Sequence, residues 1–257
     1  MPSVLQNLDI EPAFPALNFG RDALLLDIDG TIIDIAPTPE AVVVPESLKL
    51  SLSRLRDEMG GALALISGRT LGAIDELFTP LKFAAAADHG AEIRLQPDDE
   101  ARHFAAPLTS AEKAAFAPIA KLDPRLRVED KVYTLAVHYR LVPELGETVI
   151  ARITDAAAKL PENKIRVLCG KAVIEVKRCG FDKGTGVREI MQHQPFAGRR
   201  PIFFGDDLTD EDALAVLPEF SGLGISVGRL LRGAAREVSS PAQVRLWLAE
   251  LAASKRS

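Results

Sequence analysis

The stretch Ala23-Leu24-Leu25-Leu26-Asp27-Ile28-Asp29-Gly30-Thr31 places two carboxylates, two residues apart, at the end of an apolar run. The run from Ala23 to Leu26 is typical of a buried strand in a parallel sheet. In open α/β sheets, ligands bind outside the carboxyl ends of the strands, where Asp27 and Asp29 are expected to lie. Two like charges there are costly unless a divalent cation and fixed donors accompany them. The alternative is a plain turn, in which the aspartates cap a loop and Gly30 supplies a positive φ.

The composition indicates a globular chain that is long enough for one large domain or two smaller ones. It has 257 residues, of which 47% are hydrophobic, and a formal net charge of -5. This acidic balance offers no basic field for nucleic acid or an anionic membrane, so both are excluded as partners. No apolar stretch of about 18 residues occurs, and Met1 to Gly20 has no positively charged start followed by an apolar run. We therefore expect a cytoplasmic monomer that does not associate with membranes.

The two cysteines, Cys169 and Cys179, stand ten residues apart with no histidine pattern near them. Free cysteines are among the most buried residues in proteins. We therefore expect buried structural thiols rather than zinc ligands or a disulfide.

Apolar runs alternate with amphipathic helices in the first and last parts of the chain. After Pro45, apolar residues recur at helical spacing up to Met59, and Gly60-Gly61 ends this predicted helix. Short apolar runs that are typical of buried strands occupy residues 62–66, 83–87, 202–204 and, as the last predicted strand, 223–227. The alternation predicts an α/β fold with a doubly wound parallel sheet that is covered on both faces.

Between residues 105 and 180 the pattern changes. Thr109 and Glu112 match a capping box at the start of a helix. Residues 132–139 alternate like a half-covered antiparallel strand, and two further apolar runs flank Gly170-Lys171 like the strands of a hairpin. We therefore expect an inserted α+β cap at residues 105–180, over a core formed by residues 1–104 and 181–257.

Polar residues that follow the predicted strands suit the transfer of a phosphoryl group. Asp27 can attack phosphorus in line and form an aspartyl phosphate. Asp29 can protonate the departing alkoxide and later deprotonate the attacking water. Ser67 and the main-chain donors around it can bind phosphate oxygens, and Lys183 can neutralise the phosphate and the carboxylates. Phosphoryl transfer needs little beyond such positioning and neutralisation of charge.

The run Gly205-Asp206-Asp207, with Asp210 behind it, adds oxygen ligands at the same predicted edge of the sheet. Mg²⁺ takes one or two carboxylates and keeps waters and a phosphate oxygen in its octahedron. We therefore predict a Mg²⁺ site in which Asp206 ranks above Asp210. Alternatively, Asp207 and Asp210 only favour the N-terminus of a helix, where negative charge is stabilising.

These segments resemble the motifs of the haloacid dehalogenase superfamily of phosphatases, and the resemblance spans residues 22–248. The segment from Asp27 to Ile32 is similar to the first motif, Ser67-Gly68-Arg69 to the second, Lys183 to the third and the run from Gly205 to Ala213 to the fourth.

The resemblance implies roles for the residues of these motifs. Asp27 is then the nucleophile and a metal ligand, and Asp29 is the acid and base and a ligand through its carbonyl oxygen. Asp206 ligates through its carboxylate, while Asp207 and Asp210 are outer or water-mediated ligands. Arg69, in the second motif, joins Ser67 among the catalytic residues.

Within that superfamily the closer likeness is to the trehalose-6-phosphate phosphatase family. It rests on further segments: His89 to Glu92, Glu129 to Lys131, His138 to Arg140, Gly170 to Glu175 and Asp182 to Gly184. Family members carry an α/β cap between the second and third motifs, where the pattern changes here. One departure concerns the hinge, because Lys177-Arg178-Cys179 occupies a stretch in which members commonly have a proline. The resemblance implies Mg²⁺-dependent hydrolysis of trehalose 6-phosphate, a small sugar phosphate, to trehalose and phosphate.

The cap is expected to select the sugar, because the core recognises phosphate whatever the leaving group. A site that hydrogen-bonds hydroxyl groups strongly rejects analogues that lack them. We predict substrate contacts from these polar residues: His89, Glu129, Lys131, His138, Arg140, Lys171 and Glu175.

Several alternatives stay open from the residues alone. Lys183 can be a solvated lysine at a helix start, Ser67 an N-cap and Arg69 a surface residue of a first helical turn. His138 can be an ordinary strand residue, and His89 part of a turn. The same chemistry also suits another sugar phosphate, such as sucrose phosphate or mannosylglycerate phosphate, or a phosphomutase. A rival of another class is a sugar-phosphate-binding protein without catalytic activity.

Overall fold

The computed structural model describes residues 14–36, 41–160 and 164–254. Of the N-terminal segment considered above, residues 1–13 lie outside this description. Within the described ranges, no helix has both the length and the apolar character that crossing a membrane requires.

The stretch that contains Leu24 to Leu26 forms a central strand of an eight-stranded sheet, in which the order is β12-β11-β10-β1-β2-β3-β4-β5. The strands are β1 (Asp22–Leu26), β2 (Leu63–Ile66), β3 (Ala84–Ala87), β4 (Glu92–Arg94), β5 (Arg102–His103), β10 (Arg200–Gly205), β11 (Leu223–Val227) and β12 (Arg236–Val238). The pairs from β12 to β3 are parallel, which confirms the predicted α/β class.

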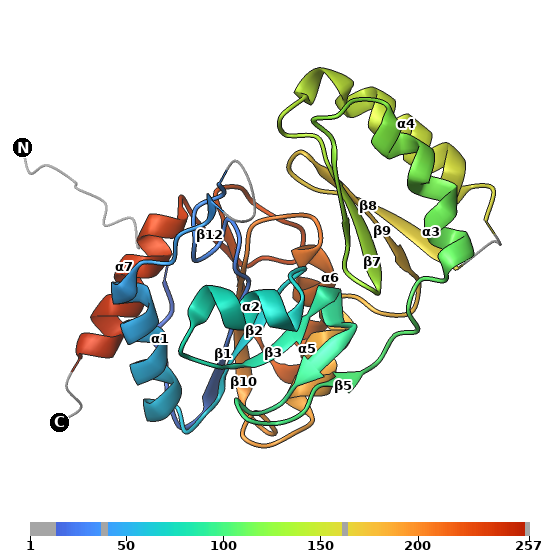
Figure 1. Ribbon diagram of the computed structural model, residues 1–257. Helices are drawn as coiled ribbons and strands as arrows, with labels where there is room; N and C mark the ends of the chain where they lie inside the picture. Colours follow the sequence, from blue (N-terminus) through green and yellow to red (C-terminus); the bar gives the residue numbers. More distant parts are fainter. Residues whose placement is uncertain (1–13, 37–40, 161–163, 255–257) are drawn as a thin grey trace, which may run out of the picture.

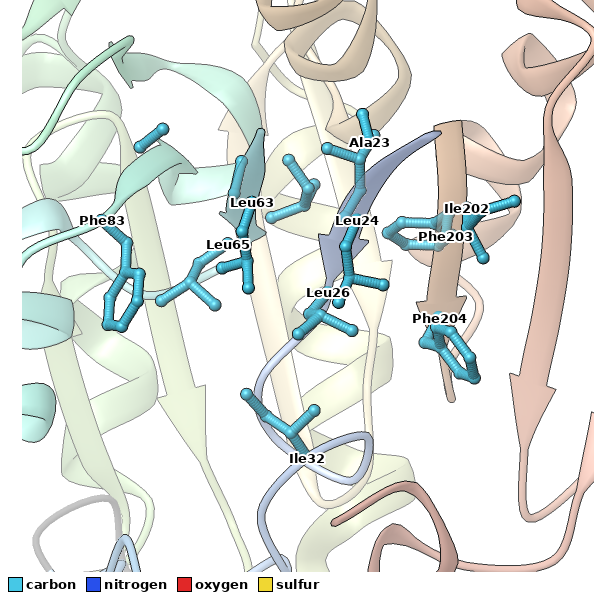
Figure 2. Packing of buried hydrophobic residues seen from close by; sticks show 14 of the residues in the cluster. Ala23, Leu24, Leu26, Ile32, Leu63, Leu65, Phe83, Ile202, Phe203 and Phe204 are labelled. Carbon is cyan, nitrogen blue, oxygen red and sulfur yellow. The ribbon is translucent and has the colours of Figure 1, made fainter. Parts of the chain in front are cut away.

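Burial on both faces explains why the central strands are continuous apolar runs. Every residue of β1 is buried, and its leucines pack between Leu63 and Leu65 of β2 on one side and Ile202, Phe203 and Phe204 of β10 on the other (Figure 2). A strand that is covered on both faces has no polar face to show in its sequence.

The sheet extends further at both edges than we predicted. β12 follows β11, so the prediction that residues 223–227 form the last strand was wrong. At the other edge β4 and β5 are antiparallel, so the sheet is mixed. These three strands have only two or three residues each, which is too short for an alternating pattern to stand out.

Helices cover both faces of this sheet (Figure 1). They are α1 (Glu46–Glu58), α2 (Leu71–Phe78), α5 (Lys183–Met191), α6 (Asp210–Val216) and α7 (Pro241–Ala253). α1 packs against α7, and α5 packs against α6 on the opposite face. This is the doubly wound arrangement that the alternation of strands and helices predicted.

A second sheet of four antiparallel strands, in the order β6-β7-β9-β8, lies between residues 127 and 178. Its strands are β6 (Arg127–Asp130), β7 (Thr134–His138), β8 (Ile165–Cys169) and β9 (Val173–Arg178), and the helices packed on it are α3 (Ser110–Phe116) and α4 (Gly146–Ala157). The capping box of Thr109 and Glu112 is present at the start of α3. This sheet and its helices have a hydrophobic cluster of their own. We propose the two clusters as the cores of two domains with the boundaries predicted above.

Alternation along β7 and β9 turns one set of side chains to the helices and the other to the core. Leu135 and Val137 of β7, with Ile174 and Val176 of β9, pack in the cluster with α3 and α4 on the outer face (Figure 1). Residues in between, such as Glu175, belong to the face that looks toward the eight-stranded sheet. The second sheet therefore presents polar side chains to the core.

Both cysteines are free thiols, but they are exposed. The expectation that they are buried was therefore wrong. Cys169 ends β8, an edge strand of the small sheet, and Cys179 lies just beyond β9, so neither sits in a covered part of the fold.

The register of the large sheet gathers its polar strand ends. Leu26 of β1 pairs with Phe204 of β10 and with Leu65 of β2. The residues just beyond, Asp27 and Asp206, therefore emerge from neighbouring strands at the same edge.

Candidate active site

The Lys183 ammonium lies between two buried carboxylates. Its Nζ donates to Asp27 Oδ1 at 2.8 Å and to Asp210 Oδ1 at 2.7 Å. Lys183 is the first residue of α5, whose N-cap is Asp182. Burial alone would lower the pKa of Lys183, but Asp210 and Asp27 hold it well above its ordinary value. Lys183 is therefore a buried ammonium, and the interpretation as a solvated lysine was wrong.

Three carboxylates meet at this ammonium. Oxygen atoms of Asp27, Asp206 and Asp210 all lie within 4.8 Å of one another, and all three residues are buried. Burial raises the pKa of Asp27 well above its ordinary value; Lys183 opposes the rise, and Asp210 and Asp206 add to it. Burial also raises the pKa of Asp210 to about 6, against the opposing charge of Lys183. A second ammonium, Lys171, contacts Asp206 at 2.5 Å. Since two ammonium groups do not balance three buried carboxylates, the donor set fits a divalent cation.

Thr31 and Asp210 fix the positions of the other carboxylates. Thr31 Oγ1 donates to Asp27 Oδ2 at 3.0 Å and lies 3.3 Å from Asp206 Oδ1. Asp210 Oδ2 accepts from the backbone N–H groups of Asp206 at 2.9 Å and of Asp207 at 3.0 Å. Asp27 and Asp206 line the cavity described below, whereas Asp210 does not, so these two are the better placed carboxylates for a metal ion.

Gly30 leaves the space into which the Asp206 side chain fits. Its φ is +86°, in the left-handed region, and a Cβ at this position would stand 2.2 Å from Asp206 Oδ2. Any larger residue would therefore collide with a carboxylate of the cluster.

Asp29 and Asp207 have other partners. Arg69 binds Asp29 through two hydrogen bonds, from Nε to Oδ2 at 2.6 Å and from Nη2 to Oδ1 at 2.7 Å. Asp207 Oδ1 accepts from Thr209 N at 2.8 Å and from Thr209 Oγ1 at 2.6 Å. The predicted roles of Asp29 and Asp207 in metal binding stay predictions. For Asp29 the predicted ligand atom is its backbone carbonyl oxygen.

Ser67 and Arg69 precede α2 instead of belonging to it. The N-cap of α2 is Thr70, whose side chain accepts from Ala73 N. The alternative interpretations, Ser67 as an N-cap and Arg69 as a first-turn residue, were therefore wrong. Ser67 is buried, and its Oγ accepts from Arg69 N at 3.2 Å.

A cavity of about 710 Å³ lies between the polar edge of the large sheet and the inner face of the small one. The predicted catalytic residues line its core side: Asp27, Asp29, Ser67, Arg69 and Lys183. All the predicted substrate-binding residues line it as well: His89, Glu129, Lys131, His138, Arg140, Lys171 and Glu175. Of the predicted metal ligands, Asp206 and Asp207 reach the cavity wall, while Asp210 lies behind it. The structure thus brings the predicted residues together, and their roles stay predictions.

Two carboxylates on the inner face of the small sheet are held by cationic or histidine partners. Glu129 Oε2 lies 2.9 Å from His138 Nε2, and this hydrogen bond lowers the pKa of Glu129 against the effect of burial. Glu175 accepts from Lys131 at 2.8 Å and lies 2.7 Å from His89 Nε2. Burial would raise the pKa of Glu175, but Lys131 and His89 hold it well below its ordinary value.

The tip of the β8–β9 hairpin reaches the carboxylate of Asp206. Lys171 Nζ donates to Asp206 Oδ2 at 2.5 Å. Arg140 donates to the backbone carbonyl of Lys171 at 2.8 Å and to the carbonyl of Ala36 in the core. These contacts connect the small sheet directly to the carboxylate cluster of the core.

Three residues of the site were missed at the level of sequence. Thr31 stands in the opening stretch, four residues after Asp27, and that spacing could have indicated it. Asp88 is fully buried and accepts from Thr134 Oγ1 of β7 at 2.5 Å. No local sequence signal joins Asp88 to Thr134, because Asp88 follows a strand of the large sheet and Thr134 lies in the small one.

Comparison with known proteins gives a consistent result. A model of the trehalose-phosphatase family matches residues 25–242. A probable trehalose-phosphate phosphatase of Sinorhizobium fredii (strain NBRC 101917 / NGR234) is 40% identical over 208 residues, which are 80% of this chain and 77% of the relative. The trehalose-6-phosphate phosphatase of Escherichia coli (strain K12) is 33% identical over 227 residues, 88% of this chain and 85% of the relative.

A solved structure resembles the whole arrangement. The C-terminal domain of the trehalose-6-phosphate phosphatase of C. albicans superposes with a TM-score of 0.79 at 25% identity, over 93% of this chain and 97% of that one. A phosphatase of the haloalkanoate superfamily from Bacteroides thetaiotaomicron has a TM-score of 0.58 at 16% identity, over 92% of this chain and 96% of that one, which shows the shared fold. The predicted resemblance and fold class are confirmed.

Gly30→Ala is expected to weaken binding of Mg²⁺ by about tenfold or more, as changes that displace a ligand commonly do. The added methyl group would displace the Asp206 carboxylate. Isothermal titration calorimetry measures the affinity. Gly72→Ala is the matched control, because a Cβ at Gly72 in α2 meets nothing within 4 Å. Equal affinities of Gly30→Ala and the native chain would contradict the proposed place of the metal.

Lowering the pH from 7 to 5 is expected to weaken Mg²⁺ binding. A proton on Asp27, whose pKa is raised, competes with the metal directly, and a proton on Asp210, whose pKa is raised to about 6, removes negative charge beside it. Calorimetry at each pH measures this dependence. The Asp210→Asn variant cannot be protonated at residue 210, so its Mg²⁺ affinity is expected to change less between pH 7 and pH 5. An affinity that is the same at pH 7 and pH 5 would show that neither group takes part.

Proposed function

This chain belongs to the trehalose-phosphatase family, and we propose that Asp27 carries its reaction as a covalent nucleophile. The activity of the family is hydrolysis of a phosphoric monoester, and trehalose 6-phosphate is the substrate, in trehalose biosynthesis. The observation that carries the assignment to Asp27 is its buried carboxylate at the wall of the cavity, hydrogen-bonded to the Lys183 ammonium.

In the first step an Asp27 carboxylate oxygen attacks phosphorus in line, and the bond from phosphorus to the sugar oxygen breaks. For this step Asp29 must carry a proton and give up one of its two hydrogen bonds from Arg69; it then gives that proton to the departing oxygen, and free trehalose leaves. In the second step water attacks phosphorus, Asp29 takes the proton from the water, and the bond from Asp27 to phosphorus breaks. Asp27 is regenerated and phosphate leaves.

Charge neutralisation is the second requirement of phosphoryl transfer. Lys183 keeps one positive charge beside Asp27 throughout the reaction. Mg²⁺ is the proposed cofactor, held by Asp27 and Asp206, and it supplies further positive charge toward the phosphate oxygens. Arg69 orients the Asp29 carboxyl group through its two hydrogen bonds, and Ser67 lies on the same wall.

The small sheet is proposed as a cap that recognises the sugar. Glu129, His138 and Glu175 present acceptors and donors to the cavity opposite Asp27. A disaccharide offers hydroxyl groups in several directions, and fixed polar side chains distinguish their arrangement. The cytoplasmic location and the monomeric state stay predictions.

A panel of phosphate esters tests the substrate. We expect kcat/KM for trehalose 6-phosphate to exceed that for glucose 6-phosphate, sucrose phosphate and mannosylglycerate phosphate by about a hundredfold or more. Release of inorganic phosphate measures the rates, and analysis of the sugar product excludes a phosphomutase. If trehalose 6-phosphate is turned over no faster than glucose 6-phosphate, the assignment of trehalose 6-phosphate as the specific substrate is wrong.

Asp27→Asn is expected to lower kcat by roughly a thousandfold or more, because the amide cannot act as the nucleophile. Mass spectrometry of acid-quenched native protein is expected to find a phosphoryl group on Asp27. Asp34→Asn is the matched control, since Asp34 lies outside the cavity and pairs with Arg245 at 3.0 Å. Retained turnover in Asp27→Asn would overturn the covalent route.

A further inference from the structure

His89, on the core side of the cavity, is placed to set the geometry of Glu175 on the cap. We propose that His89 is a positioning residue, which fixes the Glu175 carboxylate for the substrate and does not itself bind the sugar. This departs from the direct contact that the sequence suggested. The proposal deepens the proposed function and rests on it, because Glu175 is taken as a sugar-binding residue.

Neither nitrogen of the His89 ring is available to a sugar hydroxyl. Nε2 lies 2.7 Å from Glu175 Oε2. Nδ1 is buried and has no hydrogen-bond partner among the residues that the structure describes. The Glu175 carboxyl has a strongly lowered pKa, so it is a carboxylate that only accepts, and the Nε2 atom must carry the shared proton.

Glu175, in contrast, keeps capacity for a ligand. Its Oε1 accepts from Lys131 Nζ at 2.8 Å, and its Oε2 from His89. A carboxylate has about four acceptor positions, so roughly two stay free for hydroxyl groups after these two bonds. Because both oxygens are held by protein donors, the remaining positions point in fixed directions, which lowers the entropy cost of binding.

Backbone hydrogen bonds hold the turn of Asp88 and His89, from which the ring projects. His89 N donates to Ser67 O at 3.0 Å, and Asp88 N donates to Arg69 O at 2.7 Å. Asp88 and His89 both have positive φ, 43° and 55°, a conformation that non-glycine residues keep only when their surroundings enforce it. The ring also lies against Gly68, where a Cβ would stand 2.6 Å from its Cε1 and Nε2 atoms.

Two further contacts join the cap to the turn of Asp88 and His89 and to the neighbouring loop at Gly68. Thr134 Oγ1 of β7 donates to Asp88 Oδ1 at 2.5 Å, and Lys131 Nζ donates to Gly68 O at 3.0 Å. Through these contacts and the bond from His89 to Glu175, the cap rests on the loop that carries Ser67 and Arg69. The position of Glu175 over the cavity therefore depends on a core side chain.

The test compares kinetic constants of His89 variants with trehalose 6-phosphate. His89→Leu removes the donor, and we expect KM to rise about tenfold, with a smaller change in kcat, because ground-state orientation of the sugar is lost. His89→Gln can place an amide N–H near the former Nε2 position, and we expect it to restore KM to within about threefold of the native value. A purely structural role would not distinguish leucine from glutamine in this way.

A double-mutant cycle separates action through Glu175 from an independent role. Glu175→Ala raises KM by itself, and adding His89→Leu is expected to change KM by less than about twofold further. His193→Leu is the matched control, because His193 also pairs with a glutamate, Glu189, at 3.0 Å but does not line the cavity. It is expected to leave KM unchanged. Thermal melting of each variant confirms that it is folded.

Three results would overturn the proposal. In the first, His89→Leu leaves KM within about twofold of the native value. In the second, it lowers kcat alone, which would place His89 in the chemistry of the core. In the third, the effects of His89→Leu and Glu175→Ala multiply in the double variant. A native chain that does not turn over trehalose 6-phosphate would instead overturn the proposed function, and this inference with it.

Discussion

The ammonium of Lys183 offsets the repulsion between the buried Asp27 and Asp210 carboxylates, and the rest of the site is arranged around that contact. Without a positive charge there, the carboxylates of Asp27, Asp206 and Asp210 would be costly to bury together. Together with Lys171, which contacts Asp206, the Lys183 ammonium still leaves negative charge in excess, which is the physical reason to expect a divalent cation. Burial raises the pKa values of the Asp27 and Asp210 carboxyl groups, and the neighbouring carboxylates add to the rise.

In the proposed function the two sheets recognise different parts of the substrate. The edge of the large sheet supplies charge and a nucleophile for the phosphate, which every phosphoric ester shares. The small sheet turns polar side chains toward the same cavity, where hydroxyl groups of the sugar differ from one substrate to another. The two parts are joined at that cavity by contacts of Lys131, Thr134 and Glu175 with the loop and turn of the core. Lys171 and Arg140 add contacts with Asp206 and Ala36. Recognition of the sugar therefore depends on how these contacts position the cap relative to the core.

Sequence reasoning worked where a local pattern has one physical cause. The apolar run before Asp27 is a strand buried on both faces, and the capping residues Thr109 and Glu112 occur as expected. It failed for the short edge strands β4, β5 and β12, which are too brief to show a period. It also gave no indication of the contact between Asp88 and Thr134, because that contact depends on how the two sheets are placed. His89 was found, but the sequence could not show that Glu175 occupies its ring nitrogen.

The most direct test of this account is a crystal structure of the protein with Mg²⁺ and orthovanadate, which imitates phosphorus in the act of transfer. The account predicts one metal ion bound by Asp27 and Asp206 at about 2.1 Å, the distance that magnesium requires. It also predicts vanadium in line with an Asp27 oxygen, with Lys183 still hydrogen-bonded to that carboxylate. A metal ion held elsewhere, or vanadium bound away from Asp27, would contradict the central role of the neutralised carboxylate cluster.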